Sequence, residues 1–121
     1  MVRAVSSPSH DALLEAAADR AALAVILDAQ GRHRQAQETL RQALSMFESV
    51  LGRDHYEVAV TLEKLAAIAQ RAGDPERAAA LYERVLAIKR RVLGREHSEV
   101  AATLSDLESA RLAAARHPGE P

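Results

Sequence analysis

Two stretches of the chain place apolar residues on one side of a helix, and a short break separates them. The first stretch has apolar residues at the spacing i, i+3, i+4, i+7, namely Leu62, Leu65, Ala66 and Ala69. The second has an apolar face of its own, formed by Ala78, Leu81, Tyr82, Val85 and Leu86. This spacing is typical of amphipathic helices. Between them, Gly73 can end one helix, Asp74 can cap the next and Pro75 suits its first turn. The pattern predicts a helical hairpin.

The hairpin belongs to a repeat of 42 residues. Val50–His55 reads VLGRDH and Val92–His97 reads VLGREH, and 97 minus 55 is 42. The same step backwards places Gly31 under Gly73, so that a third, more diverged copy comes first. A repeat of this length predicts stacked helical units, each of which buries its apolar face against its neighbour.

Five helices are expected, near residues 8–30, 33–51, 55–72, 75–93 and 97–116. Gly52 ends one helix and either Asp54 or His55 can cap the next, while Gly94, Glu96 and Glu99 repeat this arrangement. We therefore expect one all-α domain over residues 8–116, with a flexible N-terminus at residues 1–7 and a flexible tail at residues 117–121.

The second hairpin and its flanks resemble a tetratricopeptide (TPR) array, and more narrowly the longer repeat of the kinesin-light-chain type. The matching positions are Leu81, Tyr82, Glu83, Arg84, Leu86, Ile88, Leu93, Gly94, His97, Val100, Ala101, Thr103 and Leu104. The resemblance implies a short α-α superhelix (α-solenoid) of about five antiparallel helices, or two and a half repeats. It also implies that the first helices of successive hairpins line a concave groove, which holds a peptide or helix of a partner protein.

The resemblance also points to residues on the groove wall, once the chain is aligned on Ala66, Gly73 and Ala78 as the small packing positions. In the middle unit these residues are Val60, Glu63, Lys64, Ala67, Gln70 and Arg71. The 42-residue shift adds Val25 and Asp28 in the first unit and Ser105, Asp106 and Ser109 in the last helix. The family's small packing residue is replaced by Glu108 there, so we expect the last helix to act as a cap.

Composition narrows the function further. The 121 residues suit a single domain, and 16 basic against 17 acidic residues give a net charge of -1, which disfavours a nucleic-acid partner. The chain has no cysteine and no apolar run long enough to span a bilayer, so we expect a cytoplasmic protein without a membrane partner. Abundant alanine and arginine hint at a bacterial source.

No motif with enforced chemical spacing is present, so no catalytic residue, metal site or cofactor is expected. His55 and His97 lie in equivalent loops one repeat apart without a second ligand nearby, which favours a structural role over metal binding. The basic cluster Lys89, Arg90 and Arg91 is expected to form a solvated helix face.

The most direct interpretation is a non-catalytic adaptor or scaffold that binds another protein. Two alternatives stay open. The chain could be a structural module that forms a homo-oligomer, because a short array leaves the ends of its core uncovered. Less favoured is an accessory protein or enzyme that binds a small molecule in the groove.

Overall fold

The computed structural model of the chain describes residues 9–116, which form five α-helices and no strand. The helices are α1 (His10–Ala29), α2 (His33–Leu51), α3 (Tyr56–Arg71), α4 (Pro75–Leu93) and α5 (Ser98–Ala115). The predicted all-α class and all five helices are confirmed, with each boundary within two residues of the expected one. The expectations for residues 1–7 and 117–121 lie outside the described residues.

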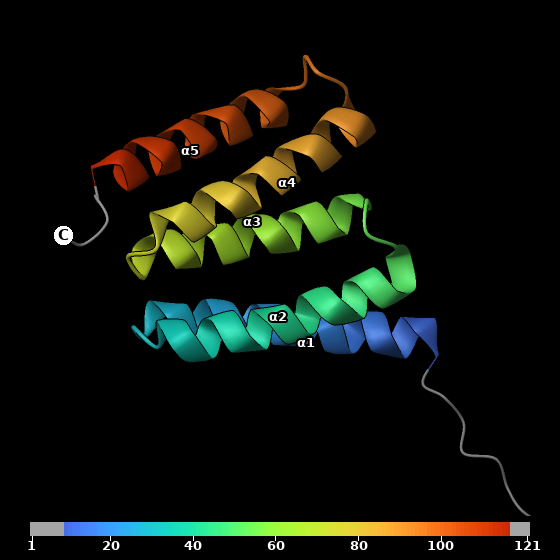
Figure 1. The fold of residues 1–121 in the computed structure, drawn as a ribbon. Coiled ribbons are helices and arrows are strands. Elements are labelled where there is room, and N and C mark those ends of the chain that lie inside the picture. The colour runs from blue at the N-terminus through green and yellow to red at the C-terminus, as the bar shows by residue number, and fades with distance from the viewer. Residues whose placement is uncertain (1–8, 117–121) are drawn as a thin grey trace, which may run out of the picture.

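Each helix packs against the next one along the chain, so the five helices form a stack of hairpins (Figure 1). Helices α1 and α2 form the first hairpin and α3 and α4 the second, while α5 packs on α4 at the C-terminal end. The arrangement is that of two and a half helical repeats.

The turn between α3 and α4 follows from three residues. Gly73 has a φ of 85°, a left-handed conformation that residues with a side chain rarely adopt. The Asp74 side chain accepts a hydrogen bond from the Arg77 amide at 3.2 Å, and Pro75 begins the helix. A Cβ atom at Gly73 would meet nothing within 4 Å. The expectation that Gly73 is a small packing position is therefore wrong, because its backbone angle requires glycine and its surroundings do not.

Histidine caps both α3 and α5. Between the two candidates for the α3 cap, the structure selects His55, whose Nδ1 accepts a hydrogen bond from the Glu57 amide at 3.0 Å. His97 repeats this bond to the Glu99 amide at 3.1 Å. The repeated histidines thus hold the starts of two equivalent helices.

We expect His55→Ala to lower the free energy of unfolding by about 1 kcal/mol, since an exposed N-cap acceptor is lost. His55→Asn supplies another acceptor at the cap and should lose only a few tenths of that amount. Urea denaturation followed by far-ultraviolet circular dichroism measures both variants. Equal stability of His55→Ala and the wild type would contradict a capping role.

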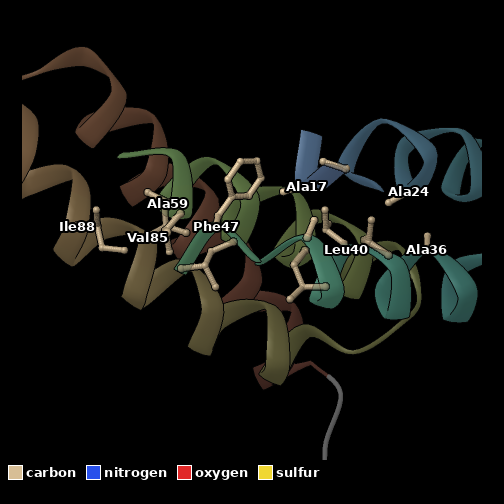
Figure 2. Close-up of a cluster of buried hydrophobic side chains, with 14 residues drawn as sticks. Ala17, Ala24, Ala36, Leu40, Phe47, Ala59, Val85 and Ile88 are labelled. Carbon is tan, nitrogen blue, oxygen red and sulfur yellow. The ribbon is translucent and has the colours of Figure 1, made fainter. Parts of the chain in front are cut away.

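The main core lies between the first four helices. Alanines at Ala17, Ala24 and Ala36 are fully buried and let α1 and α2 approach closely. Figure 2 shows Phe47 of α2 beside Ala59 of α3 and Val85 of α4, so that this ring joins the first hairpin to the second.

A second buried cluster joins α3 and α4 to α5. It contains Ala66, Ala69, Ala78, Tyr82, Leu86, Val100, Leu107 and Ala110. Ala66 and Ala78 are both fully buried, as expected of small packing positions between the two helices of a hairpin. Glu108, one repeat after Ala66, is exposed on α5, where no further helix packs within the described residues.

Candidate functional site

Helices α1, α3 and α5 share one face of the stack, called here the odd-helix face. Two side-chain bonds, each between residues 43 apart, join successive helices of this face. Arg71 Nε of α3 donates to Asp28 Oδ2 of α1 at 2.8 Å. Tyr56 of α3 donates its hydroxyl to Glu99 Oε1 of α5 at 2.7 Å. These bonds place the three helices side by side.

Asp28 and Arg71, both predicted groove residues, are engaged with each other. The Asp28 side chain is 9% exposed and also lies 2.6 Å from His33 Nδ1. Burial acts to raise the pKa of Asp28, but the hydrogen bonds and charges of Arg71 and His33 outweigh it and hold the pKa below 3.8. The stabilisation that Arg71 and His33 give to the ionised Asp28 is therefore present at neutral pH and is lost as the pH falls through this lowered pKa. This pair braces α1 against α3.

Lys89 of α4 reaches between α3 and α5. Its side chain is only 4% exposed, and its Nζ lies 3.1 Å from Glu63 Oε2 and 3.1 Å from Glu99 Oε1. The expectation that Lys89 belongs to a solvated basic face is wrong. The residue faces the seam between two helices, where the carboxylates of Glu63 and Glu99 compensate its charge, while Arg90 and Arg91 beside it are exposed.

The same network shifts the acidity of its members. Burial acts to lower the pKa of Lys89, but the bonds to Glu99 and Glu63 and their charges outweigh it and raise the pKa above 10.5. The Tyr56 hydroxyl, followed by the Lys89 ammonium, holds the pKa of Glu99 below 4.5. Both shifts favour the charged forms of Lys89 and Glu99, so this pair stays ionised over the whole neutral range.

The two junctions between repeats are built from different chemistry. Stepping back 42 residues from Lys89 gives Phe47, and from Tyr82 gives Leu40. The junction of the first and second units is therefore sealed by apolar side chains, whereas an ammonium and a phenol occupy the equivalent places at the junction with α5. We call the latter, formed by Tyr56, Glu63, Tyr82, Lys89 and Glu99, the polar junction.

The other predicted site residues differ in exposure. Those that are exposed are Val25, Lys64, Ser105, Asp106 and Ser109, and those that are half-buried are Val60, Ala67 and Gln70. Lys64 and Asp106 form no ion pair with any residue between 9 and 116. No described residue therefore pairs with either of these two exposed charges.

Tyr56, Tyr82, Lys89 and Glu99 were not among the predicted site residues. Tyr82 and Lys89 lie two turns apart on α4, the second helix of its hairpin, whereas the resemblance places the groove on the first helices. The signal that could have found them was present, because the 42-residue alignment sets them against buried apolar residues. A charged group in an apolar position of a repeat indicates compensating partners nearby, as Glu63 and Glu99 are for Lys89.

We expect both tyrosines to ionise late in the folded protein. The hydrogen bond to Glu99 raises the pKa of Tyr56 above 10.0, and burial, together with the charges of Asp106 and Glu63, raises the pKa of Tyr82 to about 12. Because the pKa of Tyr82 is higher in the folded than in the unfolded chain, the neutral phenol stabilises the fold below pH 10.0. This stabilisation is lost as the pH rises through the pKa of the folded state. Because the chain has two tyrosines and no tryptophan, near-ultraviolet absorbance reports their ionisation cleanly. Coincident titrations of native and urea-unfolded protein would contradict the polar junction.

The described part of the chain offers no group of three or more His, Asp or Glu residues that could hold a metal ion. A hollow of about 470 Å³ lies away from the polar junction and is lined by Leu27 of α1 and by residues around the start of α2. Within residues 9–116, no helix combines the length and apolar character needed to cross a membrane.

Comparison with known proteins agrees with this architecture. The family model described as "Tetratricopeptide repeat" matches residues 14–91 and, in a second overlapping match, residues 57–118. A search of curated proteins finds no significant match. The match is to the repeat in general, so the kinesin-light-chain subtype stays a prediction. The stacked hairpins, the buried alanines and the match across nearly all described residues establish that this chain belongs to the tetratricopeptide repeat family.

Proposed function

We propose that the chain is a non-catalytic adaptor or scaffold that binds a peptide or helix of a partner protein on the odd-helix face. The observation that supports the proposal is that Lys64, Asp106 and Ser109 are exposed there and that their side chains make no hydrogen bond or ion pair to a described residue. Tetratricopeptide repeats generally act as protein-interaction modules, which agrees with this proposal. In keeping with the absence of cysteine, we place the module in the cytoplasm.

The odd-helix face combines the two kinds of contact that recognition needs. Val25 is 51% exposed, and Val60 and Ala67 are half-buried, so a partner segment would find apolar area along α1 and α3. Lys64 and Asp106 would then select partners by charge, which influences specificity and association rate more than affinity.

The test is affinity capture from a lysate of the source organism with wild type, Lys64→Glu and Arg90→Glu. Arg90 is a matched control, because it is an exposed cation on α4 with no ion pair to a described residue. Arg71 is unsuitable for this test, since its reversal would also break the bond to Asp28. A protein retained by wild type and Arg90→Glu but lost from Lys64→Glu supports the proposal. Equal retention by all three chains contradicts it.

A second candidate function is assembly into a homodimer, and the outer face of α1 favours it. Leu23 and Ile26 are 47% and 54% exposed, whereas their counterparts one repeat later, Leu65 and Ile68, are 1% and 2% exposed. In α3 this face packs on the preceding hairpin, and the described residues contain no hairpin before α1. Adjacent exposed apolar side chains of this kind mark interaction surfaces.

Sedimentation equilibrium tests the dimer. A dimer of the wild type that dissociates in Leu23→Glu/Ile26→Glu supports this second function, because both side chains are exposed and their replacement leaves the core intact. Leu107 is unsuitable for such a test, since it is 3% exposed and its replacement would disrupt the second cluster. A monomeric wild type at high concentration overturns the dimer.

A further inference from the structure

Tyr82 is a buried residue whose hydroxyl has no hydrogen-bond partner among the described residues. Tyr82 is 4% exposed, and its hydroxyl makes no hydrogen bond to any described residue. Among those residues, Arg77 Nε is the single fully buried side-chain nitrogen or oxygen without a partner, so the Tyr82 hydroxyl must reach solvent. Buried tyrosines usually find a hydrogen-bond partner for this group. Here the group is left open at the surface.

The ring of Tyr82 is fixed between α3 and α5. It packs in the cluster that contains Ala66 and Ala69 of α3 and Leu107 and Ala110 of α5. The hydroxyl therefore opens at the seam between these two helices. The negative charges of Asp106 and Glu63, one from each helix, both act on it.

The seam carries more negative than positive charge. Glu63 and Glu99 share the one ammonium of Lys89, and Asp106 has no cation partner within the described residues. Arg71, the cation whose charge acts on Tyr82, is paired with Asp28. Lys64 lies two helical turns before Arg71 and thus on the α1 side of α3. A cationic ligand would therefore be favoured at the seam.

We propose that the seam between α3 and α5 takes a basic side chain from the bound partner segment, with Asp106 and the Tyr82 hydroxyl oxygen as its acceptors. This inference rests on the proposed function and names the partner chemistry. Arginine suits the place better than lysine, because its planar guanidinium donates to two acceptors in a fixed fork. The partner segment is accordingly a peptide or helix that carries an arginine next to apolar residues. The acidic seam would repel nucleic acid.

A phage-displayed library of random peptides, selected on the immobilised chain, tests the inference. We expect the selected sequences to be enriched in arginine over the unselected library. Affinity of a selected peptide should fall about tenfold with Asp106→Asn, as expected for loss of a charge-assisted hydrogen bond, and severalfold with Tyr82→Phe. Asp54→Asn is the matched control, since Asp54 is exposed in the loop before α3 and pairs only with Arg91 among described residues. It should leave affinity unchanged.

Other outcomes separate this inference from the proposed function. Enrichment of acidic or uncharged peptides, or equal binding by Asp106→Asn and wild type, overturns the basic-ligand site and leaves peptide binding standing. Failure to enrich any peptide overturns both. Melting curves show whether a loss of affinity comes from unfolding. Tyr82→Phe removes no hydrogen bond to a described residue and should unfold at the same temperature as the wild type.

Discussion

Replacing Phe47 with alanine should lower the free energy of unfolding by about 3 kcal/mol, a large part of the 5–15 kcal/mol of a typical domain. Phe47 is the one phenylalanine of the chain and is 5% exposed. Its ring lies beside Ala59 and Val85, two side chains too small to fill the space that it would leave (Figure 2). The variant therefore loses both the buried area and the packing of the first junction.

Phe47→Leu is the control, because it keeps most of the apolar volume and should lose only about 1 kcal/mol. Urea denaturation monitored by circular dichroism gives both values, and the m-value shows whether unfolding stays cooperative. A loss below about 1 kcal/mol for Phe47→Ala would contradict the view that this ring holds the two hairpins together.

Lys89→Ala should destabilise the chain by about 2 kcal/mol, although lysine is usually a surface residue. The substitution removes a buried stem and leaves Glu63 and Glu99 facing each other without a cation. We set the loss below that of a fully buried pair, since the two carboxylate side chains are 32% and 38% exposed and water screens their repulsion. Lys89→Met retains the stem and isolates the effect of the charge.

The stability gap between Lys89→Met and wild type should narrow in acid. In the wild type the pKa of Glu99 is lowered, so its contribution is present above 4.5 and is lost as pH falls through the lowered value. Without the ammonium, protonation of Glu99 relieves its repulsion of Glu63, so the variant loses less stability than the wild type as the pH falls. Urea midpoints across this range measure the gap, and a gap that stays constant with pH would contradict an ionic role for Lys89.

The helices and their order could be predicted because local chemistry decides them. The helical spacing of apolar residues, the glycines that end helices and the residues that cap them each depend only on neighbouring positions in the sequence. The 42-residue repeat then shows which helices are equivalent. Residue type alone could not decide between Asp54 and His55 as the cap. The path of the backbone decides which side chain reaches the Glu57 amide, and that side chain is His55.

The polar junction was harder to predict because its partners come from three helices. Lys89 stands beside two exposed arginines in the sequence, and only the packing of α4 turns it away from them. Its partners Glu63 and Glu99 lie 26 residues before and 10 residues after it. The bonds between residues 43 apart, Asp28 to Arg71 and Tyr56 to Glu99, likewise depend on how successive odd helices face each other.

Amide chemical shifts of the isotope-labelled chain, recorded with and without a peptide selected on it, locate the binding surface most directly. Binding on the odd-helix face predicts shifts concentrated in α3 around Lys64 and in α5 around Asp106, with the amides of α2 unchanged. Shifts concentrated in α2 and α4, or confined to the outer face of α1 near Leu23 and Ile26, would contradict the proposed binding face.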